Sequence, residues 1–282
     1  MTEAWNGDVV MAGTATCGGT DRLAVAELTP SGAPVGGFGT GGLALLAGPS
    51  GGYGVATQPD GKIAVAGQTG NSKSTYRCLV AQLTTAGALD SSFGSKGTVQ
   101  PAPSSCVVEY NVAALGEGDV LASGAGFTNQ VVIEATELLP SGAPNTSFGT
   151  GAGTATMDDG SVGSQTMAVL GDGELLFGST HGTVALMTAS GAPDTTFGSD
   201  GVSTLSVPGS SNTAVNGVAA SSTGGVLYAA GATVIGGRDE LMVGALQGVD
   251  QPAAVAKAVK AAKKTGKGRR RRHRRHRKPK RH

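Results

Sequence analysis

Short runs of apolar and β-branched residues, separated by glycine-rich turns, fill the chain from its start to about residue 246. The clearest stretch, residues 53–99, carries such runs at 54–57, 62–67, 78–83 and 97–100. Runs of this length, bounded by Pro-Asp-Gly or Gly-rich turns, are typical of hairpins. The pattern therefore predicts about four strands in each 50 residues, roughly 18 strands in all, and almost no helix before Ala253.

A repeated motif, called the phrase below, occurs four times; each copy begins with Ser-Gly-Ala or Ala-Gly-Ala and ends in Phe-Gly. The repeated phenylalanines are Phe38, Phe93, Phe148 and Phe197, and the intervals between them are 55, 55 and 49 residues. A period in this range indicates a fold that stacks or circles one supersecondary unit. We interpret the four rings as structural plugs between neighbouring units; the alternative is a row of rings that lines a ligand-binding face.

Four strands in about 50 residues, repeated, is typical of a β-propeller. The predicted fold class is therefore all-β: a β-propeller of about five four-stranded repeats, the first of them incomplete. The expected units are, approximately, residues 1–42, 43–97, 98–152, 153–201 and 202–250, followed by a tail at 251–282. Positions expected to be buried are Val9, Val65, Leu79, Val80, Leu121, Val132, Leu176 and Leu227.

The repeats amount to four and a half blades, because the first starts at its third strand and the fifth ends near Leu246. Two outcomes are open for the bare strand edges. Either they drive self-association, or Leu241–Leu246 pairs with Val9–Gly13 and closes a distorted five-bladed ring.

Three segments of the second repeat, residues 58–67, 79–83 and 89–94, together resemble the delta-60 repeat family of bacterial β-propeller proteins. The resemblance covers residues 7 to about 246. It implies a closed ring, usually of more blades, in a protein that is often exported or attached to the cell envelope. The chain is then the C-terminal portion of such a ring, or its start is misplaced; with an authentic start and no signal peptide, a cytoplasmic location is the alternative.

The sign of the net charge changes from negative to positive at about residue 252. Residues 1–252 hold 20 acidic and six basic side chains, a net charge of −14, whereas the last 30 residues hold fifteen basic side chains and no acid. We expect this tail to be disordered by self-repulsion and to bind polyanions through charge neutralisation. Its candidate binding residues are Lys257, Lys260, Lys263, Lys264, Lys267, Arg269, Arg270, Arg271, Arg272, Arg274, Arg275, Arg277, Lys278, Lys280 and Arg281.

The composition of the tail does not identify the polymer that the tail binds. One hypothesis is a non-catalytic exported or envelope-associated scaffold that is tethered to anionic wall or surface polymers. A second is an intracellular protein associated with nucleic acid, and a third is a propeller hydrolase or lyase whose site is not recognised. The tail could also serve only as a solubilising extension that folds back on the acidic body.

Catalytic and metal-binding motifs are absent from the sequence, so we expect no cofactor, no metal and no enzymatic activity. His181, the one histidine of the body, falls in a turn, and Asp158-Asp159-Gly160 is interpreted as a hairpin turn. Asp90 and Asp194 each precede two hydroxyl residues, which predicts Asx turns.

The cysteines do not follow the period of the repeat. Cys17, Cys78 and Cys106 occupy unmatched positions, so no disulfide that recurs from repeat to repeat is expected. Cys78 aligns with Leu23 of the preceding repeat and is interpreted as a small buried apolar residue. No stretch of about 20 apolar residues predicts a membrane span.

Overall fold

The computed structural model describes residues 1–72, 74–101, 106–127, 130–160, 163–221 and 226–247. Nineteen strands within these ranges form five antiparallel sheets, each built from consecutive strands of the chain. In the same ranges, the one helical element is the 3-10 turn η1 (Gly116–Gly118). No helix of the described residues is long and apolar enough to cross a membrane.

The sheets follow the order of the sequence. The first sheet holds β1 (Thr2–Glu3), β2 (Val9–Cys17), β3 (Thr20–Leu28) and β4 (Leu43–Leu45). The second holds β5 (Ser50–Thr57), β6 (Ile63–Thr69), β7 (Arg77–Leu83) and β8 (Thr98–Val99). The third holds β9 (Val108–Ala114), β10 (Val120–Phe127), β11 (Val131–Leu138) and β12 (Thr154–Met157). The fourth holds β13 (Ser164–Val169), β14 (Leu175–Ser179), β15 (Thr183–Met187) and β16 (Val202–Thr204). The fifth holds β17 (Ser210–Ala220), β18 (Val226–Ile235) and β19 (Arg238–Gln247).

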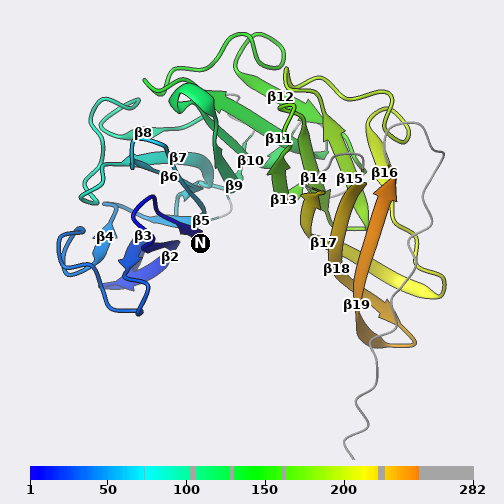
Figure 1. The fold of residues 1–282 in the computed structure, drawn as a ribbon, viewed down its shortest axis with the longest axis horizontal. Helices are drawn as coiled ribbons and strands as arrows, with labels where there is room; N and C mark the ends of the chain where they lie inside the picture. The colour runs from blue at the N-terminus through cyan, green and yellow to red at the C-terminus, as the bar shows by residue number, and fades with distance from the viewer. Residues whose placement is uncertain (73, 102–105, 128–129, 161–162, 222–225, 248–282) are drawn as a thin grey trace, which may run out of the picture.

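The sheets stand like blades along an arc, from the blue first sheet over the green third sheet to the orange fifth sheet (Figure 1). The first strands of successive sheets, β5, β9, β13 and β17, contact one another and form the inner side of the arc. This arrangement confirms the all-β, propeller-type fold expected from the repeats.

The second, third and fourth sheets each begin with an inner strand of six to eight residues, and the first four sheets each end with a short strand that follows the Phe-Gly pair. Thr98 after the second Phe-Gly pair lies opposite Ala81 of β7, so this strand completes the second sheet. The run at 97–100 was expected as the last strand of the stretch 53–99, whereas the approximate units 43–97 and 98–152 divide the chain just before β8. The difference arises because β8 pairs with the strand that precedes the phrase, and the sheet bounds are therefore shifted from the repeat bounds.

Four apolar layers fill the spaces between successive sheets, and each contains one of the repeated phenylalanines. Phe93, for example, packs with Ala64 and Val80 of the second sheet and with Val120 and Leu138 of the third. The other three layers hold Phe38, Phe148 and Phe197 in the corresponding places. The packing explains the near-continuous apolar strands of the middle sheets, since these sheets are covered on both faces.

The repeated phrase also links neighbouring sheets through backbone hydrogen bonds, and we call each such contact a joint. The N–H of the glycine after Phe donates to the carbonyl of the first residue of the next phrase. The three joints are Gly39 to Ala86 at 2.9 Å, Gly94 to Ser141 at 2.8 Å and Gly149 to Ser190 at 2.8 Å. The glycine of the next phrase lies against the ring; a Cβ on Gly87 would lie 3.0 Å from Phe38, and its φ of 77° also favours glycine.

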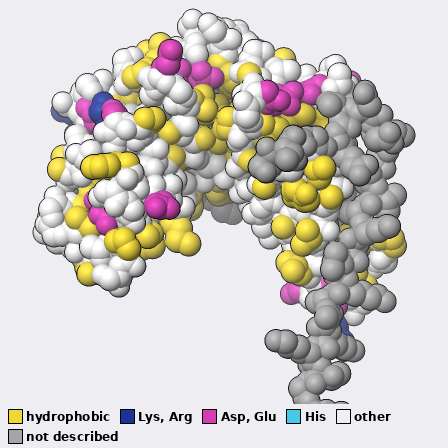
Figure 2. Space-filling model, in the orientation of Figure 1, with side chains coloured by type: hydrophobic (Ala, Val, Ile, Leu, Met, Phe, Trp, Pro, Cys, Tyr) yellow, Lys and Arg dark blue, Asp and Glu magenta, His cyan; other side chains and the backbone are white. Residues whose placement is uncertain are grey.

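The arc is open, as the space between its two ends shows (Figure 2). Residues Ile63–Ala66 of β6 in the second sheet are all buried, whereas Leu227 to Ala232 of β18 alternate between covered and exposed positions. Alternation of this kind marks a sheet with one free face. Within the described residues β2 pairs with β1 and β3, and β19 pairs with β18. The suggested closure of the ring by pairing Leu241–Leu246 with Val9–Gly13 is therefore wrong for the single chain.

The first sheet, at the other end of the arc, explains one incorrect burial prediction. Val65, Leu79, Val80, Leu121, Val132, Leu176 and Leu227 are buried as expected. Val9 is only half-buried, and its neighbour Val10 is fully buried instead. Val10 faces the second sheet, and Val9 faces the side of the first sheet that no other sheet covers.

Candidate functional site

The residues singled out from the sequence fall into two groups in the structure. Phe38, Phe93, Phe148 and Phe197 lie between sheets with 1%, 0%, 2% and 5% of their surface exposed, so none of the rings is presented to a ligand. The fifteen basic residues of the tail, Lys257 to Arg281, lie outside the described residues.

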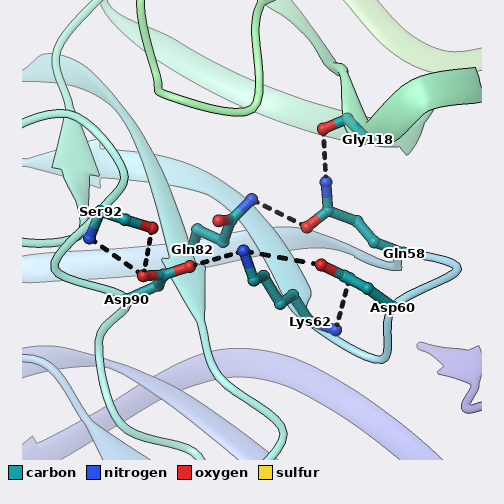
Figure 3. A network of polar contacts seen from close by, with 7 residues as sticks. All are labelled: Gln58, Asp60, Lys62, Gln82, Asp90, Ser92 and Gly118. Atoms are coloured by element: carbon teal, nitrogen blue, oxygen red, sulfur yellow. Dashed lines mark hydrogen bonds and ion pairs between the residues drawn. The ribbon is translucent and has the colours of Figure 1, made fainter.

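Polar residues of the second repeat form a network of hydrogen bonds and ion pairs (Figure 3). The amide of Gln82 donates to the Gln58 side chain at 2.8 Å, and the Gln58 amide in turn donates to the carbonyl of Gly118 in the third sheet at 2.7 Å. Lys62 lies 3.0 Å from the Asp90 carboxylate and 3.5 Å from that of Asp60. The network thus ties a turn, a strand and the neighbouring sheet together.

The aspartates of the repeated phrase make Asx turns. Asp90 accepts hydrogen bonds from the hydroxyl and the N–H of Ser92, and Asp194 accepts the same pair from Thr196. Hydrogen bonds from Ser92, followed by that from Lys62, lower the pKa of Asp90 to about 2. Asp158 likewise accepts the N–H of Gly160, as in a turn. These carboxylates therefore serve local geometry.

The cysteine prediction needs a correction. Cys78 is buried, as expected, but it is joined to Cys106 in a disulfide with a Cα–Cα distance of 5.5 Å. The bond connects β7 of the second sheet to the segment that enters the third sheet. Sequence analysis missed the bond because the two cysteines occupy unrelated positions of the repeat and become neighbours only when two sheets pack together.

A cavity of about 570 Å³ lies between the first and second sheets. Polar side chains of Asp21, Gln68 and Asn71 line it together with the rings of Tyr53 and Tyr76. Asp21 accepts a hydrogen bond from Thr16 at 2.6 Å, which holds its carboxylate at the rim. Planar polar groups beside aromatic rings form a surface that suits hydroxyl-rich, ring-shaped ligands.

Tyr53 and Tyr76 line the cavity, and a third tyrosine, Tyr110, packs against Tyr53. The rings of Tyr53 and Tyr110 meet edge to face with centroids 5.5 Å apart. Burial, and then the neighbouring Tyr110 and Tyr76 hydroxyls, raise the pKa of Tyr53.

Two of these tyrosines occupy equivalent β-bulges. In β5 the register skips Tyr53, since Gly52 lies opposite Gly67 and Gly54 lies opposite Ala66. In β9 the register skips Tyr110 in the same way, between Glu109 and Asn111. Bulges redirect a side chain and are frequent next to binding sites. The bulge was not readable from the sequence, because apolar alternation alone does not reveal an extra residue in a strand.

Residues outside the cavity show no catalytic grouping in the part of the chain that the structure describes. His181 lies in the turn between β14 and β15 with a φ of 65°, as the sequence predicted for a turn residue. The cavity itself offers hydrogen-bonding and stacking groups.

Comparison with known proteins agrees with the resemblance seen in the second repeat. Residues 58–93 match a family described as "Domain of unknown function (DUF5122) beta-propeller", which confirms the resemblance over this stretch. The matched segment contains the network of Gln58, Lys62, Gln82 and Asp90.

Among solved structures, the chain is similar to a protein of unknown function from Bacteroides caccae. The two share 12% sequence identity with a TM-score of 0.46, over 81% of this chain and 70% of the other. No curated protein sequence matches the chain significantly.

Proposed function

We propose that the chain is a non-catalytic, exported or envelope-associated interaction protein that is held on anionic surface polymers. In this proposal the basic tail contacts the anionic groups, and the cavity beside Tyr53 and Tyr76 receives the sugar rings. The observation that carries the proposal is a cavity of about 570 Å³ that is lined by Tyr53 and Tyr76, with Tyr110 packed against Tyr53. A scaffold that merely presented a tail would need no such cavity.

The disulfide supports the exported location. Bonds of this kind form and persist in oxidising compartments and are rare in the cytosol of most organisms. Cys78 and Cys106 are both buried, at 1% and 2% exposure, so the bond lies within the fold rather than on its surface.

The tail and the cavity make separable contributions, which gives the first prediction. We expect the full-length chain to bind both an immobilised acidic polysaccharide and double-stranded DNA at 50 mM salt. Raising the salt to 200 mM should weaken DNA binding by about 10³-fold or more, because many counterions are released on binding. Deletion of residues 257–282 should abolish DNA binding while the body stays folded, as measured by surface plasmon resonance and circular dichroism.

Two tyrosine variants give the second prediction, which tests whether the cavity contributes to polysaccharide binding but not to DNA binding. Tyr53→Ala should weaken polysaccharide binding about fivefold and leave DNA binding unchanged, since a stacked ring contributes about 1 kcal/mol. Tyr228→Ala is the matched control, because Tyr228 is 42% exposed on the fifth sheet and Tyr53 is 43% exposed. If Tyr53→Ala leaves polysaccharide binding intact, the cavity is not the site, and equal salt-sensitive binding to both polymers would favour the nucleic-acid alternative.

A further inference from the structure

Two buried carboxylates face each other across a glycine in the third sheet. Gly124 of β10 lies opposite Glu109 of β9 on one side and opposite Glu134 of β11 on the other. Both glutamates are 0% exposed. A Cβ at nearby Gly126 would collide with the Glu134 carboxylate, so the second glycine makes room for it.

Other sheets fill the same positions with residues that carry no charge. In the second sheet the corresponding Gly67 lies between Gly52 and Leu79. In the fifth sheet the corresponding Gly231 lies between Val215 and Met242, both fully buried. The repeat therefore does not require an acidic residue at either position. The third sheet departs from the repeat at both positions that lie opposite Gly124, with Glu109 and Glu134.

The two carboxylates lack the partners that buried charges need. Oε2 of Glu109 and both carboxylate oxygens of Glu134 accept no hydrogen bond from the described residues. Burial, and then the Glu134 charge, raise the pKa of Glu109 well above its usual range. A buried carboxylate without a donor or a cation is strongly unfavourable.

Two cysteine sulfurs lie beside this pair. One ligand atom from each of Cys78, Cys106 and Glu109 falls within 4.8 Å of the other two. The Cys106 sulfur lies 3.6 Å from Oε1 of Glu109. Zinc bonds of about 2.3 Å to sulfur and about 2.0–2.2 Å to oxygen would span such a cluster after small adjustments.

We propose that in the dithiol form of the protein Cys78, Cys106 and Glu109 bind one Zn²⁺, with exogenous water or thiol completing the coordination. Thiolate sulfur favours Zn²⁺ over the hard cations Mg²⁺ and Ca²⁺. Formation of the Cys78–Cys106 bond removes two electrons from the two thiolates, which pass to a disulfide oxidant, and it releases the ion. Reduction by an added phosphine returns two electrons to the sulfurs and restores the site. This inference does not depend on polymer binding.

The test uses the full-length chain, reduced with a water-soluble phosphine and kept free of air. Cobalt(II) serves as the spectroscopic probe for zinc. The reduced chain should show a thiolate-to-cobalt charge-transfer band in the near ultraviolet, and one equivalent of Zn²⁺ should abolish it. The oxidised chain, which has the same sequence, should show no band.

Three variants assign the ligands. Cys78→Ser should lose the band, and Glu109→Gln should weaken zinc binding at least tenfold in a chelator competition. Cys17→Ser is the matched control and should behave like the parent, because Cys17 is the free cysteine outside the cluster. Absence of the band in the reduced parent chain, or unchanged binding by Glu109→Gln, would overturn the proposal. Persistence of the band in a folded Cys78→Ser chain would do the same.

Discussion

Replacement of Phe93 by alanine is expected to lower the free energy of unfolding by about 3–5 kcal/mol, the usual effect of emptying a buried phenylalanine position. Phe93 is fully buried in the layer between the second and third sheets. It precedes Gly94, whose N–H donates to Ser141 across the joint. The loss should therefore affect both the packing and the alignment of the two sheets.

Urea unfolding followed by circular dichroism measures this effect. Phe127→Ala is the matched control, because Phe127 lies on β10 and is 52% exposed. Its truncation should change stability by no more than about 0.5 kcal/mol. Equal effects of the two substitutions would show that the repeated ring does not hold the sheets together.

Replacement of Glu134 by leucine, the residue that the second sheet has at this position, is expected to stabilise the disulfide-bonded chain above pH 7. Burial raises the pKa of Glu134 from 4.5 to about 7 in the folded protein. A group whose pKa is raised on folding favours the folded state below its unfolded pKa, and this benefit is lost as the pH rises through the folded value. The parent chain should lose about 3 kcal/mol of stability between pH 4.5 and pH 7 from this residue.

Thermal and urea unfolding of the two chains from pH 4 to pH 8 measure the difference. Glu134→Leu should lose most of this decline, with a remainder from Glu109, whose pKa is raised in the same direction. Glu134→Gln should also remove the pH dependence, but it leaves a buried amide in place of the apolar side chain. A parent chain whose stability does not fall over this range, or a leucine variant with the parent's slope, would contradict the account.

Much of the architecture was predictable because the repeat imposes it. The strand runs, the Asx turns at Asp90 and Asp194, and the buried phenylalanines all recur with the period, so each copy supports the interpretation of the others. Features outside the period were not predictable. Cys78 and Cys106, and likewise Glu109 and Glu134, lie 28 and 25 residues apart and become neighbours only through strand register and sheet packing.

The candidate binding cavity shows the same division. Tyr53 and Tyr110 occupy equivalent positions of the repeat. The alternation of apolar and polar residues along a strand does not reveal that each of them lies in a β-bulge, outside the regular strand register. Tyr76 comes from the loop between β6 and β7, where no regular pattern constrains its position. The burial of Val9 was mispredicted for a different reason, because its exposure depends on the absence of a neighbouring sheet on one side of the first sheet.

The ends of the open arc expose sheet surfaces and strand edges that a closed ring would cover. β19 is the outer strand of the fifth sheet, and Leu241 and Val243 on it are 66% and 40% exposed. Exposed strand edges with apolar side chains recruit other strands. We therefore expect copies of the chain to associate through these ends.

Light scattering coupled to gel filtration tests the central claim, that five sheets joined in series leave an open arc. The account predicts species heavier than the 27.6 kDa single chain, with a mass that rises with protein concentration. A monodisperse monomer of 27.6 kDa that stays soluble at high concentration would contradict it and would indicate that the chain closes on itself in solution.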